Sequence, residues 1–401
     1  MKWVKNEDNY RVPIKSWCGE IEDGALKQAE DLAKHPAIFK HVALMPDCHQ
    51  GYGMPIGGVI ACEDAVIPNA VGVDIGCGMG AVKTDLPVTE TSRELIRQIV
   101  TRVKELVPCG EGKAHKKKQD WNGFDEKIEN PQDRKWYSEH IWKLANRNLG
   151  TLGGGNHFIE LQEGDDGYVW LMIHSGSRNL GYQIARYYNQ VAMSLNDKLK
   201  SKIPNKDLAF LPLSSKEGKA YITDMNFALD YAKENRRRIM ESFKEALSES
   251  FPDTEFECPI NIHHNYAGIE NHFGKNVWVH RKGATSARTN EAGIIPGSMG
   301  SPSYIVEGLG SSDSFTSCSH GAGRAMGRNE ASRRLSVEEC NEAMEGIVFD
   351  RWNKVRHGKE KGSHDLGEAP QAYKDIDTVI ESELDLIKPL VKLRPLGVVK
   401  G

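Results

Sequence analysis

Histidine, cysteine and aspartate side chains recur in five glycine-rich segments that are spread along most of this 401-residue chain. The segments are GVDIGCGMG (72–80), GGGNHF (153–158), IHSGSR (173–178), NIHHNYAG (261–268) and CSHGAG (318–323). Glycine permits tight turns and a close approach of the backbone, so these side chains are presented to a bound group rather than packed in a core. A site that uses all of them needs residues 74 and 320 in one folded unit. We therefore expect a single large mixed α+β domain over residues 1–401, in which β-rich glycine loops carry the site and helices flank it.

The hydrophobic pattern favours the same fold class. Short apolar runs that are punctuated by glycine and proline predict strands at 41–45, 57–62, 71–84 and 168–174, and again through 258–325. Helical periodicity predicts helices at about 179–201 and 219–249, near 336–347, and within a final helix and strand at 377–401. The helical portion at about 179–250 is expected to be a flank or an insertion. Its Arg236, Arg237 and Arg238 are predicted to lie mostly on a solvent-exposed face.

The clearest helix in the sequence begins near residue 91. Thr91 and Glu94 have the spacing of a capping box, and Pro108 is expected to end the helix. One apolar face is formed by Leu95, Ile99, Val103 and Leu106. The segment 110–135 is polar and charged without periodicity, so we expect it to form an exposed loop or lid.

Composition is that of an ordinary globular protein, with 39% hydrophobic and 27% charged residues. The net charge of −4 excludes a globally basic nucleic-acid binder, although it permits a local basic groove. The eight cysteines include no C-x-x-C pair, and the first residues (MKWVKNEDNY) are polar. No apolar run approaches the roughly 18–20 residues of a membrane span. These features predict a soluble protein of the reducing cytoplasm with no membrane segment.

The clustered side chains suit a metal centre. Asp74 and Cys77 lie three residues apart across a glycine-rich turn, which can point both at one ion, although Cys77 could instead be a small buried hydrophobe. His157 and His174 could likewise be hydrogen-bonded structural histidines. Neighbouring strand residues face opposite ways, so only one of the pair at 263–264 is expected to be a ligand, and spacing does not choose between them.

The mixture of donors narrows the kind of ion. Imidazoles, a thiolate and a carboxylate suit Mn, Fe, Co or Zn, and a single thiolate argues against a structural zinc site. A thiolate can bridge two ions, and the number of candidate ligands exceeds what one tetrahedral ion needs. Two ions about 3.5–4 Å apart are suited to phosphoryl chemistry.

Two further segments could bind phosphate. GSMGSPS (297–303) and SHGAGR (319–324) offer successive backbone N–H groups in turns, with the hydroxyls of Ser298 and Ser303 nearby. Arg178 and Arg324 could add bidentate contacts, although either glycine segment could also be a plain turn. The chain has no G-x-x-x-x-G-K-[ST] motif and no K-x-D-G motif.

His320 differs from the other histidines because Gly321-Ala322-Gly323 follows it and Arg324 lies four residues on. Anion-binding groups therefore surround this imidazole. It could be a further metal ligand, a hydrogen-bond donor to phosphate, or a covalent nucleophile on phosphorus. The residues alone leave these three roles open.

Taken together, the motifs resemble those of the RtcB family of RNA-splicing ligases, from about residue 11 to the C-terminus. The matching motifs are MPDCHQGYG (45–53), GVDIGCGM (72–79), GTLGGGNHFIE (150–160), HSGSR (174–178), HHNY (263–266), RKGATSAR (281–288), IIPGSMG (294–300), CSHGAGR (318–324), AYKDID (372–377) and VKG (399–401). These motifs are long and specific, and they cover nearly the whole chain.

The resemblance implies a ligase that depends on GTP and two Mn²⁺ ions. It would join RNA ends that bear a 2′,3′-cyclic phosphate or a 3′-phosphate to 5′-hydroxyl ends, and it would act as a monomer. Cys77 would bridge the ions, with Asp74 and His157 on one ion, and His174 and His264 on the other. His320 would be the nucleophile that takes GMP from GTP. The implied guanylate contacts are Asn156, His157, Phe158, Ile159, Glu160, His264, Asn265, Pro296, Gly297, Ser298, Met299, Ser303, His320, Gly321, Ala322, Gly323, Tyr373 and Lys400.

Physical reasoning adds detail and two rival functions. A carboxylate such as Glu160 can accept hydrogen bonds from the guanine N1–H and N2 amine, which adenine lacks. RNA could cross basic surfaces at 116–118, 281–282 or 328–334, with salt-dependent affinity. One rival is a two-metal phosphatase or phosphodiesterase that uses water and needs no GTP. The other is a non-catalytic protein that binds RNA or nucleotides.

Overall fold

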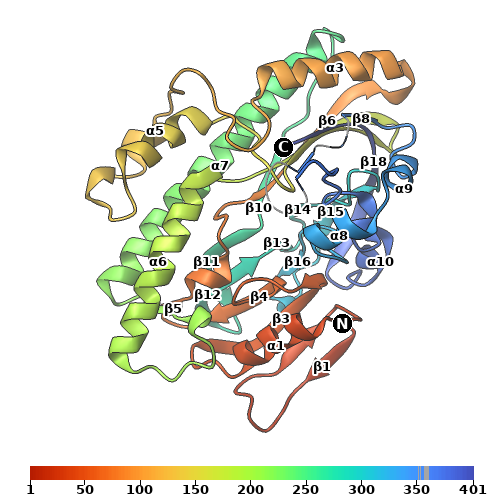
Figure 1. The fold of residues 1–401 in the computed structure, drawn as a ribbon. Helices are drawn as coiled ribbons and strands as arrows, with labels where there is room; N and C mark the ends of the chain where they lie inside the picture. The colour runs from red at the N-terminus through yellow and green to blue at the C-terminus, as the bar shows by residue number, and fades with distance from the viewer. Residues whose placement is uncertain (351, 353, 356–360) are drawn as a thin grey trace.

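The computed structural model describes residues 1–401 except 351, 353 and 356–360, and within them two main sheets lie against each other (Figure 1). The first sheet has six strands in the order β1-β2-β3-β4-β12-β11. Their bounds are Trp3–Lys5 (β1), Ile14–Ser16 (β2), Ile38–His49 (β3), Ile56–Cys62 (β4), Lys275–Lys282 (β12) and Asn265–His272 (β11). The pairs are antiparallel apart from β2 and β3, which run parallel.

The second sheet has eight strands among the described residues, in the order β10-β6-β8-β7-β18-β15-β14, with β17 beside β18. Their bounds are Ile260–His263 (β10), Gly78–Pro87 (β6), Tyr168–Ser175 (β8), Phe158–Gly164 (β7), Ile387–Lys400 (β18), Ser303–Gly308 (β15), Ala292–Ile295 (β14) and Val348–Phe349 (β17). Two short ribbons pair Ala284–Ser286 (β13) with Ser317–Ser319 (β16), and Ala65–Val66 (β5) with Leu211–Pro212 (β9).

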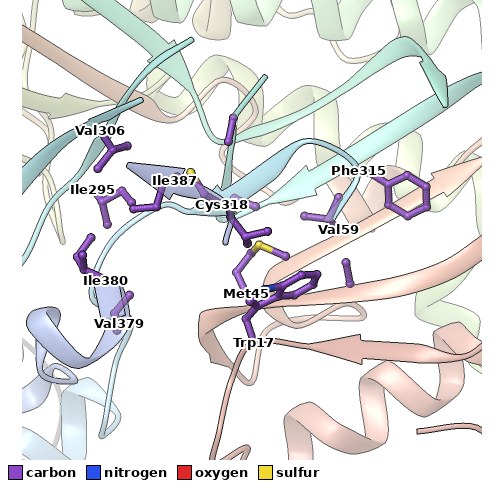
Figure 2. Packing of buried hydrophobic residues seen from close by; sticks show 14 of the residues in the cluster. Trp17, Met45, Val59, Ile295, Val306, Phe315, Cys318, Val379, Ile380 and Ile387 are labelled. Atoms are coloured by element: carbon purple, nitrogen blue, oxygen red, sulfur yellow. The ribbon is translucent and has the colours of Figure 1, made fainter. Parts of the chain in front are cut away.

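One apolar core joins the two sheets. Figure 2 shows Trp17, Met45 and Val59, from the side of the first sheet, in the same cluster as Ile295 and Val306 of the second. All five side chains are buried. Because the sheets share this core, the protein has the single α+β architecture that the sequence predicts.

Helices lie around the sheets. Their bounds are Asp23–Ala33 (α1), Pro68–Val71 (α2), Arg93–Leu106 (α3), Gly123–Glu126 (α4), Glu139–Asn148 (α5), Arg178–Leu199 (α6), Lys216–Ser248 (α7), Arg328–Arg334 (α8), Val337–Glu342 (α9) and Ile376–Glu381 (α10). The long α6 and α7 run side by side along one flank, and α7 packs against β6, β8 and β10 (Figure 1). That this helical portion is an insertion stays a prediction. In the part of the chain that the structure describes, no helix is long and apolar enough to cross a membrane.

The start of α3 differs from the prediction. Ser92, not Thr91, is the N-cap, and its hydroxyl accepts a hydrogen bond from the Leu95 backbone N–H. The Thr91 hydroxyl instead donates to the Val88 carbonyl in the preceding turn. Thr91 and Glu94 therefore form no capping box, because the helix begins one residue later than their spacing requires.

Two other predictions about exposure are wrong. The segment 110–135 is not wholly an exposed loop, because it contains α4 and buries Phe124 and Ile128 in a core formed mainly by the flanking helices. Arg236 is also buried, with none of its surface exposed, whereas its neighbour Arg237 is exposed as predicted. In each case the surrounding residues are polar, so the sequence pattern predicted an exposed segment although one or two of its side chains are buried.

Candidate metal centre and nucleotide cleft

The candidate ligands come together where the two sheets meet. Cys77 directly precedes β6, His157 precedes β7, and His174 lies one residue from the end of β8. His264 is the single residue between β10 of one sheet and β11 of the other. Strand register aligns the ligand-bearing ends, since Phe158 lies opposite His174 and Gly78 lies opposite both Ser175 and His263.

Cys77, His174 and His264 form one buried cluster of donor atoms. The Cys77 Sγ lies 3.2 Å from the His174 Nε2, which lies 3.4 Å from the His264 Nε2. Two ligands that are each about 2.0–2.1 Å from one tetrahedral ion lie about 3.3 Å apart. The separations therefore fit a shared cation.

Asp74, Cys77 and His157 form a second cluster around the same thiol. The His157 Nε2 lies 3.4 Å from both the Cys77 Sγ and the Asp74 Oδ2. Gly176 makes room for the carboxylate, because a Cβ at this position would lie 2.4 Å from the Asp74 Oδ2. Cys77 is thus common to both clusters, which suits a bridging ligand.

The histidines direct their Nε2 atoms at these clusters. The Nδ1–H of His174 donates to the Asn156 carbonyl at 3.1 Å, which places its proton on Nδ1 and leaves Nε2 as the metal-binding atom. The His157 Nδ1 lies 3.0 Å from the Leu152 carbonyl and 3.1 Å from the Arg178 Nη1, and its Nε2 faces the Cys77 and Asp74 side chains. Burial lowers the pKa of both imidazoles, which keeps them neutral. The imidazole nitrogens, the Cys77 sulfur and the Asp74 carboxylate lie close enough together to share cations, so the donor set fits a metal.

His263 points away from the cluster that contains His264. Its Nδ1 lies 3.0 Å from the Arg236 guanidinium, which donates to it. The same Nδ1 lies 3.1 Å from the Gly76 carbonyl, but a nitrogen that accepts from arginine has no proton to give that oxygen. Burial lowers the pKa of His263 to about 3, so the ring is neutral. The structure therefore brings His264 into the cluster and leaves His263 outside.

His320 follows β16 and lies beside the metal ligands, with its ring centroid 4.9 Å from that of His264. Its Nδ1 lies 2.6 Å from the Oδ2 of Asp47, a fully buried carboxylate to which the His320 backbone N–H also donates. Sequence reasoning missed Asp47. The segment MPDCHQ (45–50) contains this one acidic residue, and a lone carboxylate within a family motif could have indicated a role in the site.

The cleft in front of His320 is open to solvent and encloses about 770 Å³ including its open mouth. The predicted guanylate contacts that line it are Asn156, Phe158, Pro296, Gly297, Ser298, Met299, His320, Gly321, Ala322, Gly323, Tyr373 and Lys400. Four others are not among the residues that line it. Ile159 packs in an apolar core, Asn265 bridges the Asp74 carbonyl and the Gly283 N–H, and Glu160 and Ser303 are buried.

Cations outnumber carboxylates at the cleft. Arg324, Arg328 and Lys400 line it together with Glu368, and all three lie within 3.5 Å of that carboxylate. Burial raises the pKa of Glu368, but the nearby cations and the Tyr373 hydroxyl outweigh it and lower the pKa to about 2. Glu368 is therefore ionised, and the cluster keeps a net charge of about +2, which suits an anionic ligand. Sequence reasoning missed Glu368 and grouped Arg328 only with a basic surface.

Glu160 is almost completely buried on β7. Its Oε2 accepts a 2.7 Å hydrogen bond from the Gln162 side chain, whose nitrogen also lies 3.3 Å from the Ser303 hydroxyl. Burial raises the pKa of Glu160 to about 7, although Lys400 nearby opposes the shift. Its protonated and ionised forms are therefore similarly populated near neutral pH.

The predicted basic surface at 281–282 is wrong. Arg281 is fully buried and forms an ion pair with Glu270, with the shorter contact at 2.5 Å. Lys282 is 7% exposed, and burial lowers its pKa to about 7. Neither side chain can contact RNA on an open surface. Residues 116–118 are exposed, as an electrostatic contact requires.

Comparison with known proteins is consistent with this site. The family model described as tRNA-splicing ligase RtcB matches residues 28–401. The chain is 39% identical to the RNA-splicing ligase RtcB of Escherichia coli K12, over 97% of this chain and 98% of that protein. It is 33% identical to the tRNA-splicing ligase RtcB of Thermococcus kodakarensis, over 99% and 96% of the two chains. The chain therefore belongs to the RtcB family of RNA-splicing ligases.

Proposed function

We propose that this protein is a GTP- and manganese-dependent RNA ligase. It joins a 2′,3′-cyclic phosphate or 3′-phosphate end of RNA to a 5′-hydroxyl end, through a histidine–GMP intermediate. The observation that carries the proposal is that the Asp47–His320 pair and the metal-ligand clusters meet in one cationic cleft. The names of the relatives support RNA as the substrate class. A cytoplasmic monomer remains our expectation.

The residues of the two clusters would hold two Mn²⁺ ions. Asp74 and His157 would bind one ion, His174 and His264 the other, and the Cys77 thiolate would bridge them. When bound, the ions would stabilise negative charge on the reacting phosphates and favour attack by a hydroxyl.

His320 is the proposed nucleophile. Because its Nδ1–H donates to Asp47, the lone pair lies on Nε2. Nε2 attacks the α-phosphorus of GTP, so the N–P bond forms and the bond to the β-phosphate breaks, which releases pyrophosphate. A 3′-phosphate oxygen of RNA then attacks the same phosphorus and breaks the N–P bond. Finally the 5′-hydroxyl attacks the 3′-phosphorus, loses its proton and displaces GMP. An RNA that ends in a 2′,3′-cyclic phosphate must first be hydrolysed to the 3′-phosphate.

The cleft residues would bind the nucleotide and the RNA ends. The turns at 297–299 and 321–323 line the cleft, but the N–H groups of Gly297, Ser298 and Ala322 already donate within the protein. Lys400, Arg324 and Arg328 would therefore supply most of the contacts to phosphate oxygens. Tyr373 would contact the base, and an ionised Glu160 would accept from the guanine N1–H and N2 amine. RNA would continue over 116–118 and 328–334, so the affinity should fall with added salt.

A ligation assay tests the proposal. A 3′-phosphate RNA and a 5′-hydroxyl RNA are incubated with MnCl₂ and GTP, ATP or no nucleotide, and the products are separated on a denaturing gel. We expect a joined product with GTP from the wild type and from His140→Ala, which removes an exposed histidine on α5, but not from His320→Ala. Release of phosphate without GTP and without joining would instead support a two-metal phosphatase.

A further inference from the structure

Arg236 lies in the interior of α7 with its guanidinium completely buried. Its Nη1 donates to the Gly76 carbonyl at 2.8 Å and to the Ser175 carbonyl at 3.0 Å. The Nε donates to the Asn261 side chain at 2.8 Å, and Nη2 donates to the His263 Nδ1 at 3.0 Å. One side chain thus connects three segments that are far apart in the sequence.

Three of these acceptors stand directly beside a candidate ligand. The adjacent pairs are Gly76 with Cys77, Ser175 with His174, and His263 with His264. These three ligands are the members of one donor cluster. Arg236 therefore fixes the backbone or the neighbouring side chain of every member of that cluster while contacting none of the donor atoms.

The cost of burying this cation points to a role beyond packing. Among the residues that the structure describes, no carboxylate lies within ion-pair distance of Arg236 to offset the loss of solvation. Burial lowers its pKa to about 10, so the group stays charged, and its four hydrogen-bond acceptors offset part of the lost solvation.

We propose that Arg236 is a positioning residue of the metal centre, which holds the segments of Cys77, His174 and His264 at ligand distance. This inference rests on the proposed metal-dependent function. The planar fork of arginine serves four acceptors at fixed angles, and a lysine ammonium in its place cannot reproduce that geometry.

Metal titration of the whole protein tests this role without an activity readout. Mn²⁺ affinity is measured by calorimetry, and Co²⁺ is added to record the thiolate-to-cobalt absorption, for wild type, Arg236→Met, Arg236→Lys and Arg237→Met. Arg237 is the matched control, since it is the next residue of α7 and its side chain is 55% exposed. Both Arg236 variants should bind Mn²⁺ about 10–100-fold more weakly and lose part of the thiolate band, because partners behind a ligand typically contribute that much. Arg237→Met should stay within about twofold of wild type.

Unfolding of each metal-free variant is measured in parallel, so that affinity is compared only below its melting temperature. If Arg236→Met does not fold, the metal affinity and thiolate band of Arg236→Lys test the proposal instead. A folded Arg236 variant with wild-type affinity and an unchanged thiolate band would overturn the proposal, even if its melting temperature falls, and would leave the proposed ligase function intact. Failure of the wild type to bind either metal would instead overturn the metal centre itself.

Discussion

At the scale of single residues, the Asp47–His320 contact distinguishes the two ring nitrogens of His320, because Nδ1 bonds to the carboxylate and Nε2 does not. Asp47 is fully buried, and its Oδ2 accepts from both the His320 ring and the His320 backbone N–H. The ring is thereby held in one orientation, with Nε2 towards the cleft. A buried carboxylate that orients a nucleophilic or basic imidazole also stabilises the positive charge that develops on it.

Replacement of Asp47 by asparagine should therefore slow transfer of GMP to His320. We expect a loss of about 10²–10⁴-fold in the rate of adduct formation, because the orienting charge is lost while the shape is kept. Labelling with radioactive GTP gives the rate, and Mn²⁺ binding serves as the control, which should change by less than about twofold. Adduct formation at the wild-type rate in Asp47→Asn would show that the pair is not needed for the nucleophile.

Glu160 predicts a pH dependence of guanine binding. Burial raises its pKa to about 7, so the carboxyl is protonated below that pH and cannot accept from both guanine N–H groups. Affinity for GMP should therefore rise as the pH increases through about 7, by up to about tenfold per pH unit on the acid side, and then level off. Calorimetry between about pH 6 and 8 measures this. Glu160→Gln should bind GMP more weakly and without that rise; an equal rise in both proteins would assign the pH dependence to another group.

At the scale of elements, the ends and junctions of strands build the site. Gly283 joins β12 to β13 with a φ of +59°, and a Cβ there would lie 2.4 Å from the Ile56 side chain and 3.0 Å from the His320 Cε1. Gly274, in the turn between β11 and β12, has a similar φ of +77° but no atom within 4 Å of a Cβ. Substitution of Gly274 would introduce backbone strain alone, whereas substitution of Gly283 would introduce both strain and a contact with His320. Comparison of the two substitutions therefore separates these effects.

Gly283→Ala should impair the site, whereas Gly274→Ala should affect stability alone. Both substitutions place alanine in the left-handed region at a cost of about 1–2 kcal/mol, measured as the free energy of unfolding in denaturant. Only Gly283→Ala should also reduce labelling of His320 with GMP, by an expected tenfold or more (on the order of 1.4 kcal/mol). Equal labelling of the two variants would contradict the view that Gly283 makes room for the imidazole.

The sequence predicted the long elements well and the local details less well. The strand predicted at 168–174 is close to its position in the structure, because its apolar run is bounded by glycine. The strand predicted at 71–84 begins only at Gly78, since Val71 ends α2 and the residues between them form the turn that carries Asp74 and Cys77. The cap of α3 was misplaced by one residue, since both Thr91 and Ser92 can cap a helix. Arg236 was assigned to the surface because its neighbours are charged, and only the packing of α7 on β6, β8 and β10 shows that it faces inward.

At the scale of the whole molecule, the site depends on long-range packing. The motifs identified the candidate ligands, but their spacing could not choose between His263 and His264, nor show that Glu160 is buried. Those details depend on how the two sheets pack. The chain passes from one sheet to the other at His264, and the sheets share one apolar core. Metal bound at this junction would link both sheets.

Mn²⁺ should therefore stabilise the whole protein against unfolding. A ligand that binds only the folded state at about 100 times its Kd adds about 2.7 kcal/mol, which should raise the melting temperature by a few degrees. Calorimetric scans with MnCl₂ and with EDTA measure the difference. His174→Ala should lose most of this gain, and the exposed His140→Ala should keep it. Identical scans of the wild type under both conditions would argue against a metal centre at the junction of the sheets.

The most direct measurement of the central claim is covalent labelling of the protein by GTP. Wild type, His320→Ala and His140→Ala are incubated with MnCl₂ and GTP carrying ³²P at the α-phosphate, and then separated under denaturing conditions. We predict a label on wild type and His140→Ala that is acid-labile and alkali-stable, as a phosphoramidate is, and no label on His320→Ala. Folded, metal-loaded wild type that takes up no label, or a label that persists in His320→Ala, would contradict His320 as the nucleophile.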